Sequence, residues 1–156
     1  MMGCGSSVMD VPTISDQLRQ IAAAPDFPGR SAELLDAWQF AKVGIESVDP
    51  ILAFMEAYPE IDFGAPGPLV HFVESFHGRG YEERLAASLQ RKPTSMTAWM
   101  LNRLINGTQL VESRRGWIAM MRSAGNHVLA DSSVRLRVAH FVERLSLADG
   151  SDPSAL

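Results

Sequence analysis

The sequence predicts an all-α protein, and three observations lead to that prediction. Apolar residues recur at the three- and four-residue spacing of a helix through most of the 156 residues, whereas the alternation typical of strands hardly occurs. Proline, glycine and capping residues divide this pattern into about eight short segments. A hydrophobic content of 46% and a charged content of 21% are typical of a chain that folds around a core. We therefore expect about eight short helices.

The first helix is expected over residues 13–23, with a buried face formed by Ile14, Leu18 and Ile21. Pro25, Pro28 and Gly29 should end this helix. Ser31 should then cap a second helix, whose apolar stripe runs from Leu34 to Ile45.

A third helix should start at Asp49-Pro50, because an acid caps a helix and proline suits its first turn. Three prolines and two glycines predict a loop over residues 59–68, with Ile61 and Phe63 packed inward. The full set of expected helices after the second is 50–58, 67–77, 81–91, 95–106, 109–124 and 132–147.

Short turns between helices favour antiparallel neighbours, so we expect the third and fourth, fifth and sixth, and seventh and eighth helices to pair. This arrangement is typical of a HEAT-like or armadillo-like stack, or of an irregular helical bundle. The prediction is one domain over residues 13–148, between a flexible leader (1–12) and a loose tail (149–156).

The N-terminal residues and the cysteine content bear on the compartment. Cys4 is the single cysteine, which excludes an intramolecular disulfide, and no apolar run approaches the length that spans a bilayer. The run from Met2 to Ser7 fits the N-myristoylation pattern if translation starts at Met2, although a flexible leader is the simpler interpretation. We expect a cytoplasmic protein.

The net charge of −4 conceals an uneven distribution along the chain. From Glu46 to Glu83 eight acids face one base, a charge of −7; from Arg84 to Arg122 seven bases face one acid, a charge of +6. Such a distribution creates a local field that steers partners. The sequence pI near 5.5 argues against general affinity for nucleic acid, and no direct contact with it is expected.

Motifs for catalysis are missing. The chain has no Gly-x-Ser-x-Gly elbow and no glycine-rich phosphate loop, so we predict no enzyme, no catalytic residues and no cofactor. His71, Glu74 and His77 share the outer face of one expected helix, and a metal could use them. A solvated polar face is the simpler interpretation, and no metal is predicted.

A second ridge on the expected helix 95–106 consists of Trp99, Asn102, Arg103 and Asn106. An aromatic ring beside arginine and asparagine is typical of interface hot spots. The structural alternative places Trp99 in the core and uses the asparagines to bind carbonyls of neighbouring turns.

The acidic residues around the 59–68 loop form the other candidate contact surface. Glu60 and Asp62 lie in the loop itself, and rigid loops commonly carry recognition. The complete set of predicted partner-binding residues is Glu56, Glu60, Asp62, His71, Glu74, Trp99, Asn102 and Arg103.

The stretches from Pro59 to Phe72 and from Arg91 to Arg103 resemble all-helical immunity proteins of bacterial contact-dependent growth inhibition systems. The resemblance covers roughly residues 48–106. It implies a protein that binds the C-terminal domain of one cognate toxin, often a nuclease, and blocks its active site. The alternative is a helical-repeat adaptor that binds another protein or a peptide.

Overall fold

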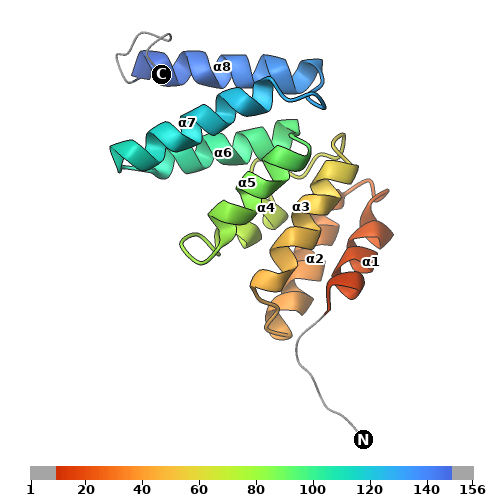
Figure 1. The fold of residues 1–156 in the computed structure, drawn as a ribbon. Coiled ribbons are helices and arrows are strands. Elements are labelled where there is room, and N and C mark those ends of the chain that lie inside the picture. Colours follow the sequence, from red (N-terminus) through yellow and green to blue (C-terminus); the bar gives the residue numbers. More distant parts are fainter. Residues whose placement is uncertain (1–9, 149–156) are drawn as a thin grey trace, which may run out of the picture. The chain divides into compact units, whose positions relative to one another are not determined.

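The computed structural model describes residues 10–148 (Figure 1). Every regular element in this range is a helix, which confirms the predicted all-α fold. The elements are α1 (Val11–Ile21), α2 (Phe27–Phe40), the 3₁₀ helix η1 (Ile45–Ser47), α3 (Val48–Ala57), α4 (Pro68–Glu74), α5 (Tyr81–Arg91), α6 (Ser95–Gly107), α7 (Val111–Gly125) and α8 (Ser132–Ala148). The myristoylation pattern, the predicted tail and all but the end of the predicted leader lie outside the described residues.

Contacts within the chain group it into two compact units. The single domain over residues 13–148 stays a prediction. We call the two units unit 1, which ends at Arg84, and unit 2, which begins at Leu85. The boundary falls inside α5, so the first turn of this helix belongs to unit 1 and the rest to unit 2.

The first helix begins earlier than the sequence predicted. The side chain of Asp10 accepts a hydrogen bond from the backbone N–H of Thr13 over 3.0 Å, which is the geometry of an N-cap. Pro12 lies in the first turn, where its missing N–H costs nothing. Residues 11 and 12, expected in the leader, are therefore helical.

The predicted start of the second helix was wrong. Asp26, not Ser31, caps α2 and accepts from the N–H of Gly29 over 3.1 Å. Pro28 occupies the first turn, a position that favours proline, so the Pro28-Gly29 pair opens a helix and does not exclude one. Ser31 is buried inside α2, where its hydroxyl donates to the carbonyl of Pro28 over 2.9 Å.

The predicted end of the second helix was also wrong, because α2 stops at Phe40 and not at residue 45. Lys42 has a φ of 58°, in the left-handed region. Its N–H bonds to the carbonyl of Gln39 over 3.1 Å, and the N–H of Val43 bonds to that of Trp38 over 2.9 Å. This is a Schellman motif, with lysine at the position where glycine is usual.

Unit 1 has a core in which α3 packs chiefly on α1 and α4 packs chiefly on α2, so the expected pairing of the third and fourth helices is only a minor contact. Aromatic rings fill part of this core: Phe27 stacks on Phe54 at 5.8 Å between centroids, and Phe63 meets Phe27 edge-on at 5.4 Å. Phe63 is 1% exposed, which confirms its inward packing, whereas Ile61 is half-buried. The 59–68 loop is thus anchored to the core by one ring.

Unit 2 contains the rest of α5 together with α6, α7 and α8, and each of these last three helices packs on the other two. The predicted pairing of the last two helices is confirmed, since α7 and α8 form the most extensive of these contacts, whereas α6 pairs with them and not chiefly with the fifth helix. Thr94 and Thr97 form a capping box at the start of α6. Gly125 lies against Val138, and a Cβ on that glycine would come within 2.8 Å of the valine Cγ1. A glycine therefore sets how closely the two helices approach.

Candidate partner-binding surfaces

The 59–68 loop presents its acids to solvent as the sequence predicted. Glu60 and Asp62 are both exposed. The carboxylate of Asp62 accepts the N–H of Gly64 over 2.9 Å, so this side chain also holds the turn. A Cβ on Gly67, where φ is 84°, would overlap the carbonyl oxygen of Phe63, so only glycine fits there. The loop therefore holds two exposed negative charges in a defined conformation.

Glu56 and Glu74 were also predicted to contact a partner. Both are half-buried, and each already interacts with another residue of the chain. Their charges are therefore less accessible than that of Glu60. This difference makes Glu60 the better probe of the acidic surface.

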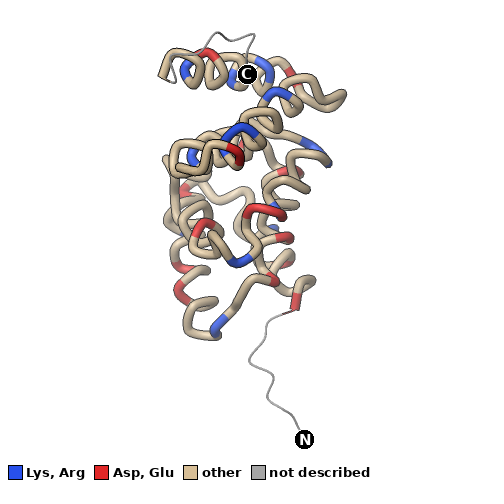
Figure 2. Tube along the Cα trace, turned by 60° about the vertical axis from the view of Figure 1, so that its left-hand side comes forward, with Lys and Arg blue, Asp and Glu red and all other residues tan. Residues whose placement is uncertain are grey.

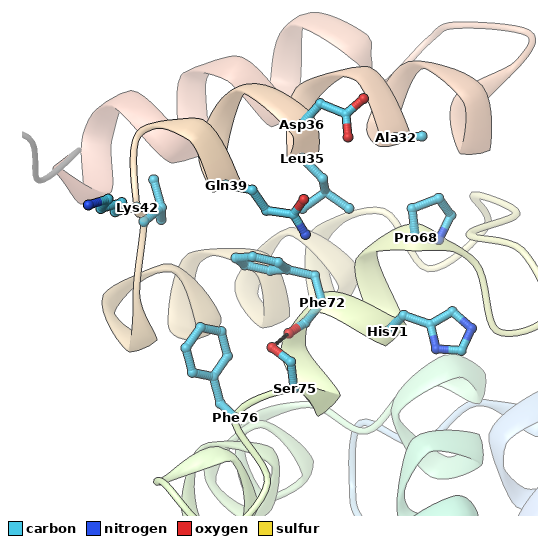
Figure 3. Close-up of a pocket in the computed structure, with 11 residues that line it drawn as sticks. Ala32, Leu35, Asp36, Gln39, Lys42, Pro68, His71, Phe72, Ser75 and Phe76 are labelled. Carbon is cyan, nitrogen blue, oxygen red and sulfur yellow. Dashed lines mark hydrogen bonds between the residues drawn. The ribbon is translucent and has the colours of Figure 1, made fainter.

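A groove of about 500 Å³ lies between α2 and α4 (Figure 3). Leu35 and Phe72 give it apolar walls, and the predicted contact residue His71 contributes from α4. Asp36 and Lys42 add charges from the α2 side, and neither was predicted. The groove combines an apolar surface with both signs of charge, a composition suited to a protein partner.

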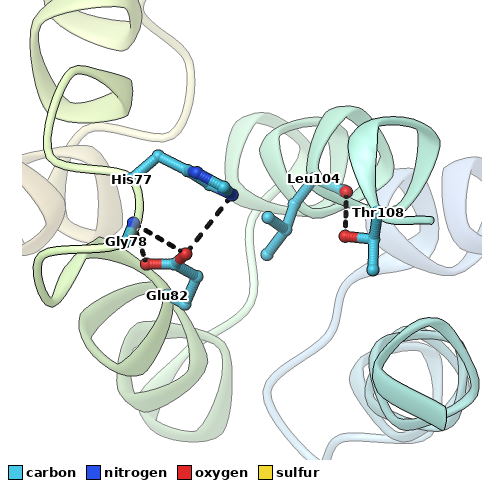
Figure 4. Close-up of polar contacts among 5 residues, drawn as sticks. All are labelled: His77, Gly78, Glu82, Leu104 and Thr108. Carbon is cyan, nitrogen blue, oxygen red and sulfur yellow. Dashed lines mark hydrogen bonds and ion pairs between the residues drawn. The ribbon is translucent and has the colours of Figure 1, made fainter. Parts of the chain in front are cut away.

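His77 belongs to the candidate metal-binding set of His71, Glu74 and His77, but its ring lies beside the carboxylate of Glu82. Nε2 of His77 lies 3.3 Å from a carboxylate oxygen of Glu82, whose two oxygens accept the N–H of Gly78 over 2.9 and 3.1 Å (Figure 4). Between residues 10 and 148, no three histidine, cysteine or acidic side chains are grouped closely enough to hold a metal ion. The observed arrangement instead closes the turn before α5.

The charge separation along the sequence coincides with the division into units. Unit 1 contains thirteen acids and five bases, a formal charge of −8. The described part of unit 2 contains three acids and nine bases, a formal charge of +6. Figure 2 shows that the acids of unit 1 are distributed over several helices and are not gathered in one loop. Each unit therefore has a field of its own sign.

A second groove, of about 380 Å³, lies between α6 and α8 in unit 2. Two predicted contact residues, Trp99 and Asn102, line it. Arg103 is the third predicted contact residue on α6. Its guanidinium lies over the indole of Trp99, with the guanidinium carbon 5.3 Å from the ring centroid. The other principal lining residues are Asn106 on α6 and His140, Phe141 and Arg144 on α8.

No protein-family model, curated protein or solved structure matches this chain. None of the helices between residues 10 and 148 combines the length and the apolar composition needed to cross a lipid bilayer. The two grooves, the acidic loop and the charges of the two units are therefore the features that bear on function.

His140 and Arg144, which line the groove between α6 and α8, were not among the predicted contact residues. Their spacing of four residues places them on one face of a helix, and that signal was present in the sequence. The sequence does not show that this face of α8 lies beside the ridge of Trp99 and Asn102 on α6. Only the packing of α6 on α8 brings the two sets together.

Proposed function

We propose that this chain is an immunity protein that neutralises a cognate bacterial toxin domain by binding it in the cytoplasm. The observation that carries the proposal is the formal charge of −8 on unit 1, displayed by exposed acids such as Glu60 and Asp36. A nuclease domain must attract a polyanion, so its substrate surface is positive. Acids on a rigid scaffold would compete for that surface, and the resemblance over residues 48–106 supports the same role.

The mechanism follows from electrostatics and shape. Long-range attraction between the acidic unit and a basic domain raises the association rate. Ala32 and Pro68, which are half-buried and line the α2/α4 groove, then supply apolar contacts that slow dissociation. The bound domain would be inhibited because its substrate surface is covered, without any chemical step.

The test begins with the toxin domain encoded directly upstream of this gene. It should copurify with the chain, and the chain should abolish its activity. The variant Asp36→Lys/Glu60→Lys should then bind about tenfold more slowly at low salt, with a weaker dependence on salt. Both positions are exposed, and no ion pair to either occurs among the described residues, so the fold should survive.

The matched control is Glu112→Lys/Glu143→Lys, which makes the same change in total charge at two exposed acids of unit 2. Its association rate should stay close to that of the wild type. Equal effects of the two variants would contradict a role for unit 1, and failure of the upstream domain to bind would contradict the immunity proposal itself.

A further inference from the structure

The α6/α8 groove contains polar groups that the fold leaves unused. Asn102 and Asn106 both line it, and neither side chain forms a hydrogen bond with any of the described residues. The structural alternative for these asparagines, binding to carbonyls of neighbouring turns, is thus not what the structure shows. Two amide groups face the same groove with their donors and acceptors available to a ligand.

The spacing of these amides matches an extended peptide. Residues four apart on a helix are separated by about 6 Å along its axis. Alternate residues of an extended chain are separated by about 6.6 Å, and their backbone N–H and C=O groups point to the same side. An asparagine side chain can donate to one backbone carbonyl and accept from one backbone N–H. Asn102 and Asn106 can therefore pair with alternate residues of one peptide lying along α6.

The opposite wall supplies one positive charge, that of Arg144, and an imidazole. His140 and Arg144 line the groove from α8, one helical turn apart, and none of the residues that line it is acidic. Arg144 is exposed and forms no ion pair with the described residues. A carboxylate on the peptide would find a charge-assisted partner there.

Aromatic rings at the groove provide contacts for apolar side chains. Trp99 and Phe141 line the groove from its two walls, and Trp99 is half-buried. The volume of about 380 Å³ lies within the usual range of ligand sites, which is about 300 to 1,000 Å³. The groove thus has room for a few residues and not for a folded domain.

We propose that the α6/α8 groove binds a short acidic peptide segment in an extended conformation. Asn102 and Asn106 hold its backbone, and Arg144 with His140 binds its carboxylates. This activity is separate from toxin neutralisation and does not depend on it. Single-stranded nucleic acid fits less well, because the lining holds one arginine and no lysine to follow a phosphate backbone.

The probe is a capped eight-residue peptide that alternates glutamate and valine, added to the full ¹⁵N-labelled chain. Its main-chain contacts do not depend on a particular sequence, so binding in the micromolar to millimolar range should be detectable. The side-chain amide signals of Asn102 and Asn106 and the indole signal of Trp99 should shift. Asn102→Ala/Asn106→Ala and Arg144→Glu should each weaken binding about tenfold.

The matched control is Arg115→Glu, which makes the same charge change at an exposed position of α7 outside the groove and should alter the affinity less than about twofold. Alanine has a higher helix propensity than asparagine, so Asn102→Ala/Asn106→Ala should keep the circular dichroism spectrum of the wild type. Absence of shifts at millimolar peptide would overturn the proposal. So would equal binding of a lysine–valine peptide, or preferential binding of an eight-nucleotide oligothymidylate.

Discussion

The indole Nε1 of Trp38 donates a hydrogen bond to Oε1 of Gln17 over 2.7 Å, and this bond joins α2 to α1. Trp38 is 0% exposed, so its N–H cannot bond to bulk water instead. Gln17→Leu should lower the free energy of unfolding by about 1 to 3 kcal/mol, because a buried donor loses its partner. Urea unfolding measures this, and the same substitution at the exposed Gln20 is the control. Equal losses at the two positions would show that the bond contributes nothing.

Two glycines of α7 should respond in opposite ways to alanine. Gly116 lies within the helix, and a Cβ there meets no atom within 4 Å. Gly116→Ala should raise the free energy of unfolding by about 0.5 to 1 kcal/mol, since glycine is costly inside a helix. Gly125→Ala should lower it, because the new methyl group would clash with Val138. Thermal unfolding of both variants provides the comparison.

The contact of Gly125 with Val138 allows a rescue experiment. If the clash causes the loss, Val138→Ala should cost less in a Gly125→Ala background than in the wild type. The double-mutant cycle measures this coupling. Additive losses would mean that the glycine acts through its backbone and not through the approach of α7 to α8.

Lys42 offers a stabilising substitution. A residue other than glycine pays about 1 to 2 kcal/mol to adopt the left-handed conformation, so Lys42→Gly should raise the free energy of unfolding by up to about 1 kcal/mol. Lys42→Ala removes the same side chain and keeps the strain, and it therefore separates backbone from side-chain effects. No gain of glycine over alanine in denaturant unfolding would contradict the assignment of strain.

Stability should depend on pH through the cap of α8. The N–H of Val134 and then the hydroxyl of Ser133 donate to Asp131, and they lower the pKa of its carboxyl below the ordinary value of 3.8. The folded state therefore binds this proton less readily than the unfolded state. The carboxylate contributes fully above pH 3.8, and its contribution is lost as the pH falls through the lowered folded value.

The variant Asp131→Asn retains an oxygen acceptor but cannot titrate. Its stability deficit relative to the wild type should shrink as the pH falls from neutrality to about 3, as measured by urea unfolding. Glu143→Gln, at an exposed carboxylate of α8, controls for the loss of one charge. A deficit that stays constant over the pH range would contradict the linkage.

The sequence predicted the fold class and most helices because apolar spacing and caps are local signals. The predicted start and end of α2 were wrong, because the local signals at both ends of this helix are ambiguous or missing. Pro28-Gly29 can end one helix or start the next, and only the position of Asp26 decides between them. At the other end, Lys42 takes a conformation for which lysine gives no local signal.

Some residues of the candidate contact surfaces could be predicted from local patterns in the sequence, and others could not. Glu60 and Asp62 could be predicted as exposed because prolines and glycines mark the loop. The ridge of Trp99 and Asn102 could be predicted from its spacing. Its partner residue Arg144 could not, because a groove between two helices depends on their packing, which no local pattern contains.

The division of α5 limits how this chain can be cut or recombined. A fragment that stops at Arg84 would retain only four residues of the helix, and one that begins at Leu85 would lack its first turn. Four residues do not sustain a helix alone, because nucleation is unfavourable. A hybrid that exchanges the oppositely charged halves between related chains should therefore be joined in the turn before Tyr81 or after Arg91, so that the helix is inherited whole.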